Sequence, residues 1–374
     1  MLKILIIPII LWLLYKLEGF VWNKYWYKNL TVTLNFENES STEGENATLS
    51  EIITNSKLMP LHILQVRFQT AVGLVFADTP NATISDNVGV SDVFAMMPYE
   101  KVTRQLTINC EKRGYYEIMR TSIVSHDLFS SDIHYINMNQ NTFMYVYPKY
   151  LDAASFNIPF ERMMGEVISS SSLYEDNFTF RGIREYTRGD TPQSINWKAT
   201  ARTGELKVNL RDHTSSQKVN ILVNLEEPAF LFDEELLEDC IRIAATLSAK
   251  FIGRQIQTEI NTNGLDIITG EAVKVGAGAS NSHITSVNKA LARIDLKKDK
   301  ASFADLIEDQ LSKSKSDDTT YIIVSTSQRD NAVDKIIKLS NICGHLSWFC
   351  PLSPGMEVKD MQSDKIDFYK IIHR

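Results

Sequence analysis

The spacing of apolar residues changes near the middle of this chain, and that change limits its possible folds. Residues 30–36 alternate apolar and polar side chains, as a strand with one buried face does. After residue 213, short apolar runs such as 219–225 alternate with amphipathic stretches such as 233–253. The first pattern predicts a β-sandwich of immunoglobulin-like size. The second predicts an open, largely parallel α/β sheet.

Further elements follow from the same patterns. Strands are predicted over 48–54, 61–68, 102–110, 115–121 and 142–147, and later over 257–261, 321–325 and 345–350. Helices are predicted around 284–294, 302–311 and 330–342, with Ser302 and Asp305 as a capping box. Residues 78–92 read as a loop excursion, and residues 276–279 read as a flexible loop.

The N-terminus carries an apolar run over residues 4–15. A helix over this run spans about 18 Å, short of a hydrocarbon core of about 30 Å. Extension past Lys16 and Glu18 to Trp22 reaches about 28 Å, and aromatic residues follow, as at a membrane interface. A cleaved signal peptide is the alternative, but no small-residue cleavage site follows Tyr15. We therefore predict a single-pass anchor in the cell membrane, with the body in the cytoplasm.

Composition excludes several classes of protein. The chain has 374 residues, 44% of them hydrophobic and 23% charged, which is enough for two domains with separate cores. Its net charge of -7 gives no attraction to nucleic acid. The four cysteines form no CxxC pair, so we interpret them as buried thiols. No cofactor-binding motif is present, and residues 276–279 lack the third glycine of a dinucleotide fingerprint.

Residues 181–203, RGIREYTRGDTPQSINWKATART, concentrate arginines, acids and aromatic residues without a clean period. We call residues 181–212 the signature segment. Gly189 and Asp190 precede Pro192, a combination typical of a turn that leads into a short helix over 192–201. The residues singled out as a partner-binding or structural site are Arg184, Glu185, Tyr186, Gly189, Asp190, Asn196, Trp197, Lys198, Arg202 and Thr203.

The signature segment resembles the bacterial domain of unknown function 58 family. Smaller patches at 113–116, 127–129 and 146–148 are similar to other parts of that family. The resemblance implies an N-terminal membrane segment, a β-rich region and a C-terminal von Willebrand factor A-like domain. It also implies a partnership with a MoxR-type AAA+ ATPase.

Two interpretations of the signature segment remain open at this stage. In the structural one, Arg184, Glu185, Asp190 and Arg202 form a buried ion network while Trp197 packs a domain junction. In the functional one, the same positions present an arginine- and tryptophan-bearing surface to an acidic partner.

The turn after Leu225 is where a von Willebrand-like domain would hold Mg²⁺ through oxygen ligands. This chain has Asn224, Glu226 and Pro228 there, so we predict a degenerate site without metal. The seven histidines show no triad or HExxH spacing, and no phosphate-binding loop occurs. The sequence therefore predicts a protein that is not an enzyme.

The predicted fold class is α+β multidomain. It comprises a membrane anchor with its interfacial segment (1–28), a β-sandwich (29–148), a connection (149–180), the signature segment (181–212) and a von Willebrand factor A-like domain (213–374). The predicted function is a membrane-anchored scaffold or adaptor that works with a MoxR-type AAA+ ATPase in assembling or remodelling a protein complex. Two alternatives are an extracellular metal-dependent adhesion module and a cell-envelope hydrolase.

Overall fold

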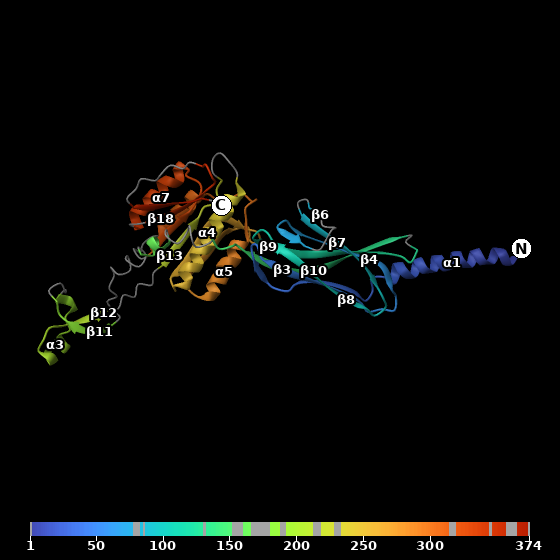
Figure 1. The fold of residues 1–374 in the computed structure, drawn as a ribbon, viewed down its shortest axis with the longest axis horizontal. Helices are drawn as coiled ribbons and strands as arrows, with labels where there is room; N and C mark the ends of the chain where they lie inside the picture. Colours follow the sequence, from blue (N-terminus) through green and yellow to red (C-terminus); the bar gives the residue numbers. More distant parts are fainter. Residues whose placement is uncertain are drawn as a thin grey trace. The chain divides into compact units, whose positions relative to one another are not determined.

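The computed structural model describes two compact units of the chain, Met1–Lys149 and Tyr150–Arg374 (Figure 1). The described residues are 2–77, 83–84, 87–129, 132–151, 160–165, 180–187, 192–211, 218–227, 233–313, 319–343, 346–356 and 365–372. Each unit has apolar clusters of its own.

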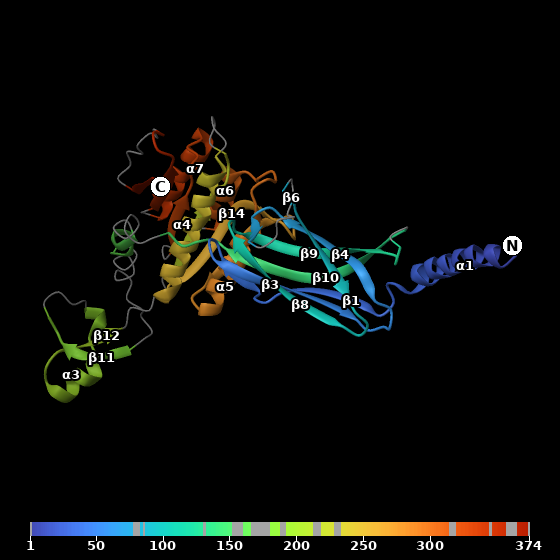
Figure 2. The same ribbon diagram turned by 45° about the vertical axis from the view of Figure 1, so that its right-hand side comes forward.

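The first unit is a sandwich of two sheets. One sheet has the antiparallel order β1 (Leu30–Phe36), β3 (Asn46–Asn55), β8 (Lys101–Cys110) and β5 (Leu74–Phe76). The other has the order β2 (Ser40–Thr42), β10 (Ile133–Tyr147), β9 (Gly114–His126), β4 (Leu61–Ala71), β7 (Asn87–Met96) and β6 (Thr83–Ile84). Figure 2 shows β1, β3 and β8 in one layer and β4, β9 and β10 in the other.

Alternating burial places one face of every long strand between the two sheets. The resulting apolar core is split into two clusters. Leu34, Leu49 and Leu106 belong to one cluster, whereas Val32 and Ile53 belong to the other. The strands run from one cluster into the other, so each strand crosses the layer that separates them.

The helix α1 (Leu2–Tyr25) precedes β1, and its last turns are part of the first unit. Trp22 and Trp26 are each 3% exposed and pack in the second cluster of the sandwich. Glu18 accepts a hydrogen bond from the backbone N–H of Leu128 at 3.1 Å. The aromatic residues at the end of α1 therefore help to close the sandwich core.

The second unit is built on a mixed sheet with the order β15 (Ala272–Gly278), β14 (Gln257–Asp266), β13 (Lys218–Val223), β17 (Thr319–Val324), β18 (Leu346–Leu352) and β19 (Ile366–Ile372). Neighbouring strands pair in parallel along β14, β13, β17, β18 and β19. In contrast, β15 and β16 (Ile294–Asp295) are antiparallel to β14. Residues 180–211 add β11 (Phe180–Glu185), the 3-10 turn Pro192–Ser194, α3 (Trp197–Thr203) and β12 (Lys207–Arg211).

Helices cover both faces of this sheet. Successive residues of β13 point to opposite faces, so each packs against a different pair of helices. Ile221 packs in the cluster that contains residues of α4 (Glu234–Gly253) and α5 (Asn281–Ala292). Leu222 packs in the cluster that contains residues of α6 (Phe303–Lys313) and α7 (Asp330–Cys343). Figure 1 shows α4 beside α5 within this unit.

The fold class predicted from the sequence is wrong. Among the described residues, no helix is both long and apolar enough to cross a membrane, so the predicted single-pass anchor and cell-membrane location are corrected. Lys16, Glu18 and Lys24 interrupt the apolar character of α1, and Trp22 and Trp26 are taken up by the sandwich. Strands dominate the structure, and the antiparallel strands β15 and β16 depart from the predicted von Willebrand factor A-like open sheet.

Two local predictions are also wrong. Residues 276–278, predicted as a flexible loop, belong to strand β15, and the ring of His283 packs against Gly278 so closely that a Cβ there would collide with it. The excursion predicted over 78–92 contains the start of β7, where Val88 and Val90 are buried. In both places polar and small residues concealed a strand that pairs at a sheet edge.

Candidate functional site

The signature segment forms a two-stranded antiparallel sheet with a short helix between its strands. Strands β11 and β12 pair antiparallel, with Ile183 opposite Asn209 and Glu185 opposite Lys207. The predicted helix over 192–201 is divided into a 3-10 turn and α3, because Ile195 makes an isolated bridge to Val208. The chain therefore reverses twice around a short helix that ends just before β12.

Asn196 holds the beginning of α3 in place. Its side-chain oxygen accepts from the N–H of Ala199 at 2.9 Å, which is an N-cap. Its side-chain nitrogen donates to Oδ1 of Asn209 at 2.7 Å, and its backbone N–H donates to the carbonyl of Lys207 at 2.8 Å. The predicted site residue Asn196 thus has a structural role that links α3 to β12.

The other end of α3 is closed by a glycine. Gly204 adopts a left-handed conformation with φ 75°, and its N–H bonds to the carbonyl of Thr200. Thr200 in turn accepts from the N–H of Lys207 at 3.0 Å, and the predicted site residue Thr203 donates to the carbonyl of Ala199 at 3.1 Å. The helix has only seven residues, yet it is tied down at both ends.

Trp197 opens α3 and is 67% exposed. Lys198 and Arg202 are exposed on the same short helix. We call Trp197, Lys198 and Arg202 the α3 surface. Ile183 and Leu206 are also 46% and 44% exposed, so apolar area lies on β11 and just before β12 as well.

Three members of the predicted buried ion network, Arg184, Glu185 and Arg202, are exposed, whereas the fourth, Asp190, lies outside the described residues. Arg184 and Glu185 are exposed on β11, and the guanidinium of Arg184 donates to the carbonyl of Glu185 at 2.9 Å. Nζ of Lys207 lies 3.2 Å from Glu185 and 3.5 Å from Glu205, and its hydrogen bond to Glu185 raises the pKa of Lys207.

The remaining predicted residues of the segment are placed as follows. Tyr186 is half-buried and donates its backbone N–H to Leu206 at 3.0 Å. Gly189 and Asp190, to which we assigned the helix entry, lie outside the described residues.

The carboxyl edge of the mixed sheet is the second place that the sequence indicated. There Asn224 accepts from Asn263 at 3.0 Å and donates to Oγ of Ser325 at 3.0 Å. Its oxygen also accepts from the N–H of Glu226 at 2.9 Å. Asn224 is 1% exposed, so it is a buried side chain whose donor and acceptor are both in use.

Glu226 is held by two other elements of the same unit. Its Oε1 accepts from the N–H of Phe303 at the start of α6 at 2.8 Å, and its Oε2 lies 3.6 Å from Arg329. The neighbouring Glu227 pairs with Lys300 at 3.1 Å. Pro228, the third position of the predicted degenerate metal site, lies outside the described residues. The oxygens at Asn224 and Glu226 therefore serve internal contacts in this structure.

Histidine, cysteine and carboxylate side chains are placed as follows in the part of the chain that is described. No group of three or more His, Cys, Asp or Glu side chains converges there. The ring of His283 contacts the carbonyl of Thr258 at 2.8 Å through Nε2, and the ring of His134 lies 6.1 Å from that of Trp26. Cys110, Cys240 and Cys350 are buried, and burial raises the pKa of each of these thiols.

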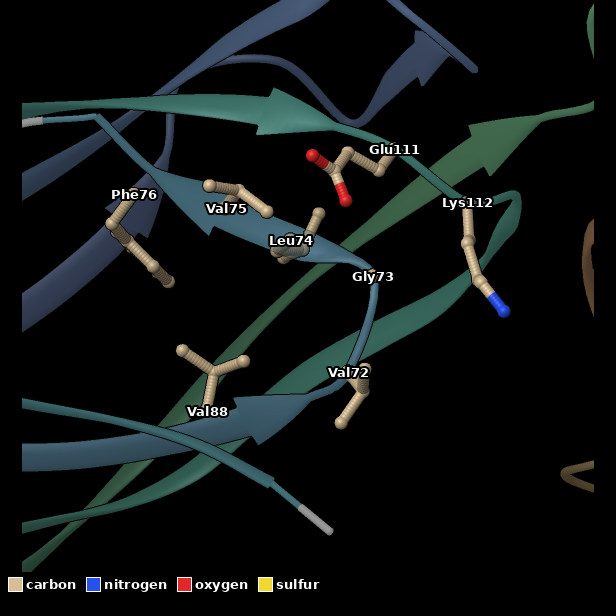
Figure 3. A pocket seen from close by; sticks show the side chains of 8 residues that line it. All are labelled: Val72, Gly73, Leu74, Val75, Phe76, Val88, Glu111 and Lys112. Carbon is tan, nitrogen blue, oxygen red and sulfur yellow. The ribbon is translucent and has the colours of Figure 1, made fainter. Parts of the chain in front are cut away.

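The first unit contains a cavity of about 320 Å³. It lies beside β5 and β7 and is lined by Val72, Gly73, Leu74, Val75, Phe76, Val88, Glu111 and Lys112. Figure 3 shows Glu111 extending over β5, whereas Lys112 points away from the apolar side chains. Gly73 has φ 123° and accepts backbone hydrogen bonds from Glu111 and Lys112, so the rim of the cavity is a constrained turn.

Sequence reasoning missed a charged layer inside the sandwich. Glu51 on β3 is 1% exposed, and neither of its carboxylate oxygens has a hydrogen-bond partner. Arg104 on β8 pairs with Asp92 on β7 at 2.7 Å. One sign could have been read in the sequence: Glu51 occupies an inward position of a strand in which Leu49 and Ile53 share its face.

No family model matches the chain, and no curated protein is similar to it. Among solved structures, a non-cellulosomal cohesin from the archaeon Archaeoglobus fulgidus is 9% identical, with 34% of this chain and 97% of the cohesin covered at a TM-score of 0.22. The CARDB domain of a Pyrococcus furiosus protein, solved with di-metal ions, is 9% identical, with 30% and 90% covered at a TM-score of 0.19. Likenesses this weak assign no activity.

Proposed function

We propose that this chain is a non-enzymatic, protein-binding scaffold that contacts its partner through the α3 surface. The observation that carries the proposal is the exposure of Trp197, at 67%, on a helix whose two ends are fixed. Tryptophan and arginine are the residue types that contribute most to binding hot spots. A large aromatic side chain left in water gains nothing for folding, but it gains area when a partner covers it.

The rigidity of α3 supports this proposal. Asn196, Gly204 and Thr200 fix the helix to β12 through hydrogen bonds, so Trp197 is presented on an ordered backbone. A partner that binds a pre-ordered surface loses less conformational entropy than one that must order a loop.

The charges of the α3 surface favour an acidic partner. Lys207 is balanced by Glu185 and Glu205. In contrast, Lys198 and Arg202 make no ion pair within the described residues, and they stand exposed beside Trp197. Positive groups with an aromatic neighbour fit a carboxylate-bearing protein surface and would accelerate its encounter.

The resemblance of the signature segment to the domain of unknown function 58 family makes a MoxR-type AAA+ ATPase our proposed partner. In this proposal the ATPase supplies nucleotide hydrolysis, and this chain supplies a binding surface for assembling or remodelling a protein complex.

The test is capture of MoxR-type ATPases by the full chain, with ATP, with ADP and without nucleotide. Trp197→Ala and Arg202→Glu are expected to reduce capture at least tenfold, because a hot-spot truncation costs about 2 kcal/mol or more. The matched controls are Tyr135→Ala, which removes a 78% exposed aromatic ring from β10, and Lys297→Glu, which reverses an exposed charge elsewhere in the second unit. Both controls should capture like the original chain.

Capture that is equal for all four variants would remove the α3 surface from the proposal. Absence of capture in every nucleotide state, with ATPases shown to hydrolyse ATP, would refute the proposed partner itself.

A further inference from the structure

The two apolar clusters of the sandwich are separated by three charged side chains at equivalent positions. On β3, Glu51 lies between Leu49 of one cluster and Ile53 of the other. On β7, Asp92 lies between Val90 and Phe94 in the same way. On β8, Arg104 lies between Leu106 of the first cluster and Val102, which packs against the second. We call Glu51, Asp92 and Arg104 the buried charge layer; the side chain of Glu51 is fully buried, whereas those of Asp92 and Arg104 are 13% and 31% exposed.

The buried charge layer holds two carboxylates and one guanidinium. Nη1 of Arg104 lies 2.7 Å from Oδ1 of Asp92. Glu51 is directly opposite Arg104 in the ladder between β3 and β8, yet both of its oxygens are without a hydrogen-bond partner. Oδ2 of Asp92 also lacks one. A single cation is therefore placed between two acids, and it serves only Asp92 in this arrangement.

This environment disfavours an ionised Glu51. The pKa of Glu51 is raised from 4.5 to about 7, chiefly by burial and then by the charge of Asp92, whereas the charge of Arg104 lowers it. The ladder partners of the two carboxylates on the remaining strands are apolar: Leu34 of β1 pairs with Glu51, and Val66 of β4 pairs with Asp92. Asp92 and Arg104 are the charged groups that act on Glu51.

The pair between Arg104 and Asp92 joins strands whose outer edges are largely uncovered. β5 pairs with β8 only along residues 108–110, and β6 pairs with β7 only at Val88 and Gly89. Within the described residues, no strand covers the outer edge of β8 over 101–107 or of β7 over 90–96. The ion pair thus links the two sheets along an edge that no further described strand covers.

We propose that Glu51 is a proton-controlled switch for this link between β7 and β8. While Glu51 carries its proton, Arg104 is left to Asp92 and the link is closed. When Glu51 releases the proton to water, a second buried carboxylate competes for the same guanidinium. Arg104 is then drawn toward its ladder neighbour Glu51, and the hold of β8 on β7 weakens.

The first measurement is the titration of Glu51 in the full chain, with ¹³C-labelled glutamate carboxyl groups observed by NMR. The Glu51 signal is identified as the one missing from Glu51→Gln. It is expected to titrate near neutral pH, and in Asp92→Asn it should titrate at lower pH, because a like charge is removed and Arg104 is released. A midpoint below pH 5 in the original chain would overturn the switch, since Glu51 would then be ionised at all relevant pH values.

The second measurement is hydrogen exchange of residues 90–96 and 101–107 in the original chain and in Glu51→Gln, compared at the same pH. At pH 8.5 these amides should exchange faster in the original chain than in Glu51→Gln. The expected ratio is about tenfold for each unit by which folding raises the pKa of Glu51. At pH 5 the two proteins should exchange alike. Glu111→Gln, which removes an exposed carboxylate of the same unit, should match the original chain at both pH values.

Equal exchange of the original chain and Glu51→Gln at pH 8.5 would also overturn the proposal, because ionisation would then leave the link unchanged. A difference of the same size at both pH values would do so too, since it would show a packing effect of glutamine rather than a proton-dependent one. The switch does not depend on the α3 surface, so its failure and that of the proposed partner are separate results.

Discussion

Arg104 of β8 reaches across the sandwich to Asp92 of β7, 2.7 Å away, although Glu51 is its direct neighbour in the β3–β8 ladder. The side chains of Arg104 and Asp92 are 31% and 13% exposed, so their ion pair is only partly buried and contributes little by itself. A fully buried carboxylate without a partner, in contrast, is costly. Here the carboxylate without a partner is Glu51, and protonation is the simplest way to remove its charge. The stability of the first unit is therefore expected to change with pH below and near neutrality.

This response predicts how the stability of the first unit varies with pH. The pKa of Glu51 is 4.5 in the unfolded reference and about 7 in the folded protein. The folded state therefore binds the extra proton between these values, and stability falls as the pH rises from about 4.5 to about 7. The loss is about 3 kcal/mol in total, and it is complete above that range.

Urea unfolding at a series of pH values, followed by tryptophan fluorescence, measures this loss. Glu51→Gln should remove the Glu51 contribution and be the more stable protein at pH 8. A stability difference between the two proteins that does not vary from pH 4 to pH 8 would contradict the assignment.

Several elements of the fold follow directly from the sequence. The alternation over Leu30–Phe36 predicts β1 with its observed bounds, and α4 begins after Asp233, which caps it through the N–H of Glu235. These segments succeed because burial on one face and a local capping bond are encoded within a few residues. Strand β19 was missed, because its residues are half-exposed at a sheet edge and carry no clear alternation.

The site was harder to predict than the strands. The signature segment identified Asn196, Trp197 and Arg202, but the exposure of Trp197 depends on where distant parts of the chain fold, and the structural interpretation placed it in a buried junction. The buried charge layer joins residues from β3, β7 and β8, and its meaning comes from pairing across two sheets. No local pattern in the sequence specifies which inward carboxylate meets which arginine.

Gly73 is predicted to be essential for the turn beside the cavity (Figure 3). Its φ is 123°, and a Cβ there would collide with the hydroxyl of Tyr116, which donates to the carbonyl of Lys112. Gly73→Ala should destabilise the first unit by about 3 kcal/mol, from backbone strain together with displacement of the ring. Gly44→Ala, with φ 88° and open space around the new Cβ, should cost only about 1 kcal/mol.

Thiol labelling across a urea series measures both glycine variants in the full chain. Cys110 is buried in the first unit, whereas Cys240 and Cys350 are buried in the second. The labelling midpoint of Cys110 should fall in Gly73→Ala while those of Cys240 and Cys350 stay unchanged. Similar shifts for Gly73→Ala and Gly44→Ala would show that the contact with Tyr116 is unimportant.

Asn224 is predicted to stabilise the carboxyl edge of the mixed sheet. Asn224→Ala removes the acceptor used by Asn263 and by the N–H of Glu226. It also removes one of the two donors to Oγ of Ser325, which keeps the N–H of Ser327. Stranded buried polar groups cost about 1–3 kcal/mol each, so the labelling midpoints of Cys240 and Cys350 should both fall. Asn331→Ala, at an exposed position on α7, is the matched control. No difference between the two alanine variants would mean that water replaces the Asn224 network.

The cap on α3 gives a prediction that separates order from contact at the α3 surface. Asn196→Ala removes both the bond to the N–H of Ala199 and the bond to Asn209, whereas Asn196→Asp keeps the acceptor for Ala199 and loses only the donor to Asn209. Losing an N-cap costs about 1 kcal/mol, so the amides of α3 should exchange about fivefold faster in Asn196→Ala and less so in Asn196→Asp. Because Trp197 remains in both proteins, any loss of ATPase capture that follows this order would come from the helix and not from the side chain. Unchanged exchange in Asn196→Ala would instead mean that the bonds from Thr200 and Gly204 to their neighbours are sufficient to hold α3.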